Sequence, residues 1–458
     1  MLKKEVNMLS GPIMPGLVAI TMPIMVMNVL QSLFNIIDMA MLKMLIPDSD
    51  IAVGAVGVCG TLITLVSCLV VGVATGANVV IAKGIGQKDR EHVEKAVGTA
   101  MVFSVLGGLV LTAVGVLCAD VFLGWVNCPA LLFPSATLYF RLYFAGVPLL
   151  MLYNFAAAAL RATGDTKRPM IYSLIGGALK ILFTYLFVST FGMTVDGVAY
   201  ATILSWVTMA LPAVIALARN KGMVRIRLAR LGLYLRELKG MISIGIPTGV
   251  QSALYTAANV IIVAAVNSFG PAASTGISIA NNFDGILYQI SIAPSLAVLP
   301  YVSQNIGAGN VKRATQAVWR GMLITVSLGA TFGMLSAVFS AELSSIMSAD
   351  PTVIAFSQQK MIIISSTYFI CGINEILGAA LRGMGKPIIP TVCALIYMCG
   401  MRFLWVYFVF PLYRNLTFLY LVWPISWILM VVTLLCFLLP RLKQLRVRFA
   451  EREAVRLV

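Results

Sequence analysis

Five ionisable side chains interrupt long apolar stretches of this 458-residue chain, and they are the residues whose types could do chemistry. The acids are Asp38, Asp284 and Glu375, and the cations are Lys180 and Arg402. A charge near the middle of a bilayer costs about 3 kcal/mol on insertion scales, so such residues usually face a cavity and pair with one another. They can carry protons or ions or bind charged groups of a cargo. The alternative role is a static ion pair that fixes helix packing.

The elements that must position these charges are membrane-spanning helices. Hydrophobic residues make up 60% of the chain and charged residues only 11%, whereas a soluble protein has about a quarter charged residues. The apolar runs do not alternate with polar residues and are long enough to cross a core of about 30 Å as helices. Twelve spans are predicted, at 16–43, 51–82, 96–119, 134–160, 169–191, 195–218, 240–268, 272–304, 315–340, 353–381, 388–411 and 416–440.

The second half of the chain repeats the first. At an offset of 221 residues, IGQKDREHVEKAV from Ile85 aligns with IGAGNVKRATQAV from Ile306, and LRATGDTKRP from Leu160 aligns with LRGMGKPIIP from Leu381. At an offset of 224, Pro23 matches Pro247, and Asn35 matches Asn259. Six spans per half is an even number, so the repeat is parallel and the two bundles are related by an axis along the membrane normal.

We therefore expect an all-α polytopic membrane protein of two pseudo-symmetric six-helix bundles. The predicted parts are an N-terminal lobe (1–218), a basic cytoplasmic linker (219–239), a C-terminal lobe (240–440) and a basic cytoplasmic tail (441–458). Two such bundles enclose a central cavity whose access can alternate when the halves rock against each other.

The distribution of basic residues predicts the orientation. Lys plus Arg is 33 against 17 acids, and 27 of the 33 fall in the segments on the side of the N-terminus. Lys43, Lys360, Arg414 and Arg141 are assigned to the opposite side. This bias predicts a multi-pass protein of the cell membrane with both termini cytoplasmic, and the short loops without a removable signal peptide suit a bacterial inner membrane.

Several kinds of chemistry are disfavoured by the residues themselves. His92 is the only histidine, and the eight Cys have no paired spacing, so we expect no metal site and no disulfide framework. There is no GxxxxGK loop to hold a nucleotide, and the bases lie between apolar runs rather than on a solvated domain that could bind nucleic acid. The twelve spans leave no room for a soluble catalytic domain, so we expect neither enzymatic activity nor a cofactor.

The chain resembles the multidrug and toxic compound extrusion (MATE) family, part of the multidrug, oligosaccharidyl-lipid and polysaccharide flippase superfamily. The similar motifs are PIMVMNVLQSLFNIID (Pro23 to Asp38), IAKGIGQKD, ALRATGDTKRP, GVAYAT (Gly197 to Thr202), SQNIGAGN and ALRGMGKPIIP. This resemblance implies a two-lobe efflux transporter that exchanges organic, often cationic compounds for protons or sodium ions. The expected partners are those small molecules and the lipid bilayer, and the chain is expected to act as a monomer.

The resemblance also implies a cation-coupling site in the first half. An acid at the place of Asp38 takes part in coupling in the family, and Asn154 and Thr202 match positions of the same polar network. Lys180 and Thr184 stand where many members have Asn and an acid, which breaks the usual sodium-ligand set. Lys180 could neutralise Asp38, and this favours proton coupling. Whether Asn154 reaches Asp38 is left open by residue counting.

Pro23 removes a backbone donor inside the first span and can let that helix bend. Other polar residues of the spans are predicted to line the substrate cavity, and two intramembrane cations against three carboxylates favour cationic cargo. The predicted cavity residues are Gln31, Asn35, Asn259, Asn282, Asp284, Tyr288, Glu375 and Arg402.

Two other classes of function stay open from the sequence. A lipid-linked saccharide flippase would share the parallel repeat but should carry more intramembrane Arg for anionic headgroups. An integral membrane enzyme, such as a polyprenyl transferase, needs clustered carboxylates for a metal-bound diphosphate, and no such cluster is present. Nothing resembles the selectivity filter of a channel.

Overall fold

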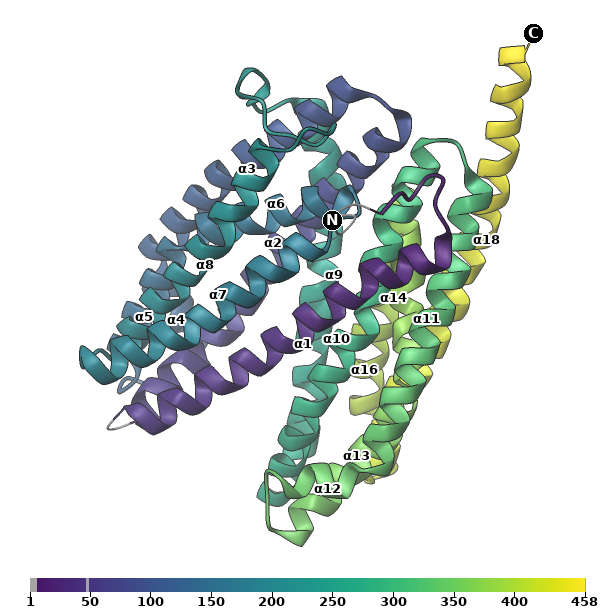
Figure 1. Ribbon diagram of the computed structural model, residues 1–458. Helices are drawn as coiled ribbons and strands as arrows, with labels where there is room; N and C mark the ends of the chain where they lie inside the picture. The colour runs from purple at the N-terminus through teal and green to yellow at the C-terminus, as the bar shows by residue number, and fades with distance from the viewer. Residues whose placement is uncertain (1–5, 47–48, 458) are drawn as a thin grey trace. The chain divides into compact units, whose positions relative to one another are not determined.

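The computed structural model describes residues 6–46 and 49–457, and within these ranges the chain is helical with no β-strand (Figure 1). Within the described residues, ten helices are long and apolar enough to cross a membrane by themselves. Two further spans are helix pairs that bend by 43° and 45° at a short break. Together they make twelve, which confirms the predicted spans and the fold class.

The first six spans are formed by α1 (Ile13–Leu45), α2 (Ser49–Gln87), α3 (Arg90–Leu117), the bent pair α5 (Phe133–Ala145) and α6 (Val147–Ala162), α7 (Lys167–Tyr185) with the π-helical turn η1 (Leu186–Thr190), and α8 (Val195–Ala218). The short helices α4 (Ala119–Trp125) and η2 (Leu228–Arg230) lie outside the spans.

The second six spans are α9 (Leu235–Asn267), α10 (Pro271–Gly307), α11 (Val311–Val338), the bent pair α13 (Pro351–Ser366) and α14 (Tyr368–Gly383), and a span that alternates α15 (Ile388–Ala394), η3 (Leu395–Gly400), α16 (Met401–Leu404) and η4 (Trp405–Val409). The last span combines α17 (Leu416–Tyr420) and α18 (Val422–Leu457), which continues as one helix through the predicted tail. The short helix α12 (Ser340–Ser345) follows α11.

The repeat is visible in the helix ends. The ends of α3 and α11 differ by 221 residues (311 − 90 and 338 − 117), and α6 and α14 differ by the same number (368 − 147 and 383 − 162). Local chemistry repeats with them: Asp89 caps α3 by accepting from the His92 amide, and Asn310 caps α11 by accepting from the Arg313 amide. Short polar residues at this position satisfy an unpaired amide of the first turn, so the repeated motif IGQKDR/IGAGNV fixes where each helix starts.

A second repeated motif ends the bent spans. Gly164 and Gly385 both adopt a positive φ, 87° and 77°, directly after α6 and α14. That conformation stops a helix and suits glycine because it has no Cβ. In the first half, Asp165 then accepts from the Arg168 amide at 3.2 Å and forms an ion pair with its guanidinium. Burial raises the pKa of the Asp165 carboxyl, an effect that Arg168 opposes.

The helices gather into two compact units. The first unit consists mainly of residues 26–249, and the second consists of residues 7–25 together with those from Val250 onwards. Helix α1 therefore passes from the second unit to the first after Met25, and α9 passes from the first to the second after Gly249. Each crossing lies two residues after a proline inside the helix, Pro23 or Pro247. The predicted lobes, 1–218 and 240–440, follow the sequence repeat and stay a prediction.

In the first unit, α2 and the start of α9 approach each other through glycines. Gly72 and Gly76 lie one turn apart on α2, as do Gly245 and Gly249 on α9. A Cβ at Gly72 would lie 2.4 Å from the Gly249 nitrogen, and one at Gly76 would lie 2.1 Å from the Met241 carbonyl oxygen. Small residues spaced by four let two helix backbones come close in a membrane, where packing replaces the hydrophobic effect between helices.

The predicted linker packs on α3 within the first unit. Glu94 is buried and receives the guanidinium groups of Arg90 and Arg227, each at 3.0 Å, and of Arg225 at 3.7 Å. Thr99 bonds both the Gly232 carbonyl and the Tyr234 amide. Some basic residues of the linker therefore hold it against α3, in addition to any effect on the orientation of the chain in the membrane.

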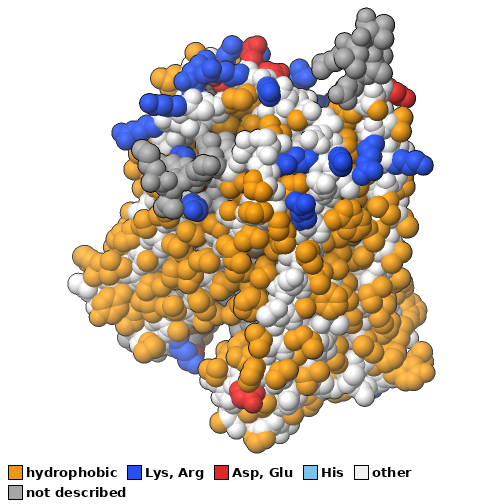
Figure 2. Space-filling view, turned by 45° about the vertical axis from the view of Figure 1, so that its right-hand side comes forward, with side chains coloured by type: hydrophobic (Ala, Val, Ile, Leu, Met, Phe, Trp, Pro, Cys, Tyr) orange, Lys and Arg blue, Asp and Glu red, His pale blue; other side chains and the backbone are white. Residues whose placement is uncertain are grey.

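In the second unit, α10 packs against α11, α13 and α14, and the segment before α1 joins them (Figure 1). Met8 is buried, and its carbonyl accepts from Arg313 Nε at 2.9 Å and from Asn305 Nδ2 at 3.1 Å. Figure 2 shows hydrophobic side chains over most of the face drawn, with Lys and Arg mostly in its upper part. Exposed residues such as Leu109, Val110 and Leu395 suit contact with lipid.

We predict that Gly76→Ala lowers the thermal stability of the purified protein, because a Cβ there meets the backbone of α9 and overpacking costs about 1–3 kcal/mol. The matched control is Gly60→Ala on the same helix, where a Cβ meets nothing within 4 Å. Alanine is the better helix former, so the control should be neutral or stabilising. The measurement is the melting temperature in detergent, and equal effects of both substitutions would contradict close α2–α9 packing.

Candidate functional site

Asp38 on α1 is buried in the first unit and paired as the sequence suggested. Its Oδ2 lies 2.9 Å from Lys180 Nζ, and its Oδ1 accepts from Thr184 Oγ1 at 3.1 Å. Lys180 and Thr184 are four residues apart on α7, so they share one face of that helix. The carboxylate is 7% exposed, and both of its oxygens are engaged by α7. The same contacts therefore neutralise the charge of Asp38 and attach α1 to α7.

A second bond joins the same two helices. Gln31 Nε2 donates to Ser173 Oγ at 2.5 Å, and Gln31 lies two turns before Asp38. The side chain of Asn35, between them, lies outside the described residues. Pro23 is buried within α1, which continues as a helix through it.

The other predicted members of the coupling network bond within their own helices. Asn154 Nδ2 donates to the Leu150 carbonyl at 2.8 Å, and Thr202 Oγ1 donates to the Val198 carbonyl at 2.9 Å. The structure therefore brings Lys180 and Thr184 to Asp38 and gives Asn154 and Thr202 local partners.

Lys360 on α13 belongs to the buried charges of the second unit. It is 1% exposed, its Nζ lies 2.7 Å from Asp284 Oδ2, and it also donates to Asn281 Oδ1. The assignment of Lys360 to an outer segment is therefore wrong. The sequence did hold a signal, since Lys360 is a lone cation inside the predicted span 353–381. Its acidic partner, Asp284, lies on another helix, α10, and no sequence pattern in either helix predicts this pair.

Glu375 and Arg382 form a second buried pair, two turns apart on α14. Arg382 NH2 lies 3.6 Å from Glu375 Oε2, and Arg382 NH1 donates to Gln251 Oε1 on α9 at 3.1 Å. Arg382 was counted only as a basic residue of an inner segment, but its side chain is buried and turns back along its own helix.

Arg402 on α16 has a different environment. It is 3% exposed, and its NH1 donates to Asn259 Oδ1 at 2.7 Å. Its guanidinium carbon lies 5.1 Å from the centre of the Trp423 ring, and Lys360 Nζ lies 5.9 Å from that same ring. Among the described residues no carboxylate lies within ion-pair distance of Arg402, and its Nε has no hydrogen-bond partner.

The count of two intramembrane cations against three carboxylates is therefore wrong. The ion pairs that involve the predicted intramembrane acids are Asp38 with Lys180, Asp284 with Lys360, and Glu375 with Arg382, and Arg402 is a fourth cation. Lys360 and Arg382 were missed because each lies near a charged loop in sequence, whereas its side chain lies among helices.

The remaining predicted cavity residues lie on α10. Asn282 is exposed and donates to the Ser278 carbonyl at 3.1 Å, whereas Tyr288 is half-buried. The Asp284 carbonyl accepts from the Tyr368 hydroxyl at 3.1 Å, which ties α10 to α14. The structure thus places these residues on one helix near Lys360.

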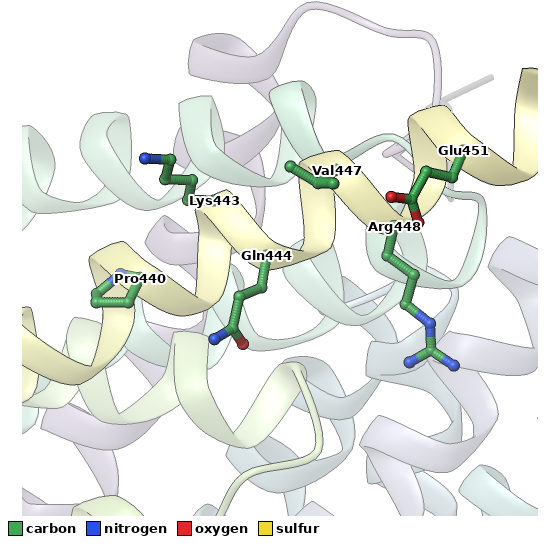
Figure 3. A pocket seen from close by; sticks show the side chains of 6 residues that line it. All are labelled: Pro440, Lys443, Gln444, Val447, Arg448 and Glu451. Atoms are coloured by element: carbon green, nitrogen blue, oxygen red, sulfur yellow. The ribbon is translucent and has the colours of Figure 1, made fainter.

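A hollow on the surface of α18 is unrelated to these charges. It is lined by Pro440, Lys443, Gln444, Val447, Arg448 and Glu451, all on successive turns of that one helix (Figure 3). None of the buried ionisable residues lines it, and we assign no substrate site to it. Within the described residues no group of three or more His, Cys, Asp or Glu side chains could hold a metal ion.

The family model MatE matches residues 23–186 and 247–408, one stretch in each half of the repeat. The chain belongs to the MATE family of transporters. In the first half, the matched stretch runs from Pro23 in α1 to Leu186 in η1 and so contains Asp38, Lys180 and Thr184. In the second, it contains Asp284, Glu375 and Arg402.

Relatives extend over most of the chain. The Bacillus subtilis protein named Probable multidrug resistance protein YpnP is 27% identical over 87% of this chain and 89% of its own length. The Shewanella oneidensis protein named FAD transporter is 21% identical over 87% of this chain and 89% of its own. A solved structure titled as an outward-facing multidrug resistance MATE family transporter superposes with a TM-score of 0.90 at 20% identity, covering 97% of this chain and 99% of that one. This match shows the shared fold.

We predict that Lys360→Met destabilises the protein, because it leaves the partly buried Asp284 carboxylate without its partner, and breaking a fully buried pair costs about 3–5 kcal/mol. The double variant Lys360→Met/Asp284→Asn should recover most of the melting temperature and the folded yield. A double variant no more stable than the single one would show that the ion pair does not determine the effect.

Proposed function

We propose that the chain is a secondary antiporter that exports small organic compounds across the cell membrane in exchange for protons. Membership of the MATE family and the relatives named multidrug resistance proteins support export of varied compounds. The observation that carries the proposal is the buried Asp38 with Lys180 and Thr184, because it is a titratable carboxylate that holds two helices together.

A proton changes this site in a defined way. When Asp38 takes a proton on its carboxylate, its negative charge is lost and its ion pair with Lys180 ends. The ammonium of Lys180 then carries an uncompensated charge in a low dielectric, which favours a rearrangement of α7 against α1. Release of the proton to the cytoplasm restores the pair. Each such cycle returns one proton inward while a compound moves outward.

Sodium fits the same site less well. A hard cation needs several oxygen ligands, and carboxylates are the strongest of them. One Asp38 oxygen faces the Lys180 ammonium at 2.9 Å, and the hydroxyl of Thr184 stands where a second acid would be. The positive charge of Lys180 repels a sodium ion from the one carboxylate present. We therefore propose proton coupling.

Alternating access follows from the route of α1. Its residues up to Met25 belong to the second unit, whereas Gln31 and Asp38 bond α7 in the first. Pro23 removes one backbone donor beside this crossing and allows a bend there. A change in the Asp38 pair can thus be transmitted along α1.

A lipid-linked saccharide flippase is the second candidate. The observation that favours it is the presence of two further cations, Lys360 and Arg382, in addition to Lys180 and Arg402, since anionic headgroups need Arg or Lys within the spans. Ethidium accumulation in cells with and without the protein distinguishes the two. Lower accumulation supports the drug exporter, and unchanged accumulation of several dyes supports the flippase.

We predict that inverted membrane vesicles take up ethidium when only a pH gradient is imposed, and not when only a sodium gradient is imposed. Asp38→Asn should abolish the pH-driven uptake while the protein still inserts, because the amide cannot take up and release the proton. The readout is ethidium fluorescence against time.

The matched control is Asp120→Asn, which neutralises an exposed acid of the first unit that pairs with Arg141 and should leave uptake unchanged. Undiminished pH-driven uptake by Asp38→Asn would contradict the coupling role. Uptake driven by sodium alone would contradict proton coupling.

We further propose that both termini are cytoplasmic, supported by the 27 of 33 basic residues in the inner segments. A green fluorescent protein fused after Val458 should therefore fluoresce in bacterial cells, and alkaline phosphatase fused there should be inactive. A fusion after Arg414 in an outer loop should give the opposite pair of results. The reverse pattern would overturn the orientation.

A further inference from the structure

Arg402 is a buried cation of the second unit, and it has no carboxylate partner among the described residues. Asp284 is paired with Lys360, and Glu375 is paired with Arg382, so both carboxylates of these spans are already engaged. Among the described residues, the contacts of the Arg402 guanidinium are the Asn259 amide, the Met398 thioether and the Trp423 ring, and none of them carries a negative charge. A guanidinium keeps its charge even when buried, so deprotonation offers no relief.

The hydrogen-bonding capacity of Arg402 is also incompletely used. A guanidinium has five N–H donors. NH1 donates to Asn259 Oδ1 at 2.7 Å, NH2 approaches only the weakly accepting sulfur of Met398 at 3.7 Å, and Nε has no partner. Unmet donors on a buried cation are costly, and an anion with two oxygens would satisfy them in the side-by-side geometry that guanidinium groups prefer.

The surroundings of Arg402 favour an anion as well. Lys360 Nζ and the Arg402 guanidinium lie 5.9 and 5.1 Å from the centre of the same Trp423 ring. Two cations thus lie beside one aromatic side chain. Asp284 pairs with one of them, Lys360, which leaves the charge of Arg402 without a carboxylate among the described residues. A ring face attracts a cation but does not cancel its charge.

The backbone around Arg402 is irregular, and one of its partners is accessible. Helix α16 is four residues long and lies between the π-helical segments η3 and η4. π-Helical turns are frequent at functional sites, where they change which way side chains point. Asn259 is exposed, so a solute that reaches its amide lies beside the NH1 of Arg402.

We propose that Arg402, together with Asn259, binds the carboxylate of organic compounds that the transporter exports. This inference rests on the proposed export function and narrows its substrate class: compounds that carry a carboxylate gain an interaction that simple organic cations lack. In the absence of such a compound, Asn259 holds the guanidinium in place.

The test uses a rhodamine dye with a free carboxyl group and the methyl ester of the same dye, which differ only at the proposed contact. Binding to the full-length protein in lipid nanodiscs is followed by fluorescence anisotropy. Arg402→Met should weaken binding of the acid about ten- to a hundredfold, the size expected for a lost charge-assisted hydrogen bond, and change binding of the ester less than twofold. Arg402→Lys should retain part of the affinity for the acid.

The matched control is Arg414→Met, which removes an exposed cation just beyond the same span and should change neither dye. Equal losses of both dyes in Arg402→Met, or an unchanged affinity for the acid, would overturn the proposal. If Arg402→Met does not fold, competition on the wild-type protein decides: benzoate should displace the acid dye and neutral benzamide should not. Displacement by both alike contradicts a carboxylate site.

A transport experiment separates this inference from the function on which it rests. Wild-type protein in proteoliposomes should move the ester dye under a pH gradient. Failure to move it contradicts the export function, whereas the ratio of acid to ester affinity in the wild type and in Arg402→Met still decides whether Arg402 binds a carboxylate.

Discussion

The cost of burying charge in a bilayer governs the internal arrangement of this protein. Among the described residues, the carboxylates of Asp38, Asp284 and Glu375 lie well inside the spans, and each is held by a cation: Asp38 by Lys180, Asp284 by Lys360, and Glu375 by Arg382. The Asp38–Lys180 and Asp284–Lys360 pairs join different helices, so each of these contacts both neutralises a charge and holds two helices together. In the antiport mechanism that we propose, loss of the charge on one partner would change which helices are attached.

Much of the fold could be predicted because it depends on local residues. Span length follows from bilayer thickness, and the repeated helix starts at Asp89 and Asn310 follow from side-chain caps that any short polar residue can make. The positive φ values of Gly164 and Gly385 likewise follow from the motif in which each glycine lies. The bends between α5 and α6 and between α13 and α14, and the π-helical segments, leave no signal in the hydrophobic periodicity of the sequence.

The candidate site was predictable in part. Lys180 and Thr184 share a helix face, and resemblance to the MATE family pointed that face at Asp38, which the structure confirms. The sequence alone assigns Lys360 to an outer segment, because its acidic partner, Asp284, is far away in sequence and lies on another helix. Asn154, which the family pattern joined to the network, bonds its own helix instead. Contacts between helices depend on the tertiary structure. A sequence pattern therefore indicates that a charge inside a span needs a partner, but it does not identify the partner residue.

The two halves of the repeat have placed different cations at nearly the same position, and the difference has chemical consequences. Lys180 lies 221 residues before Met401, the neighbour of Arg402 (401 − 180). The amine of Lys180 meets a carboxylate, so a proton on Asp38 can end that ion pair reversibly. The guanidinium of Arg402 meets an amide and keeps its charge at every physiological pH. A permanent, uncompensated cation cannot be switched by protons, but it can recognise an anion. If both proposals hold, the first half of the repeat responds to protons and the second selects cargo.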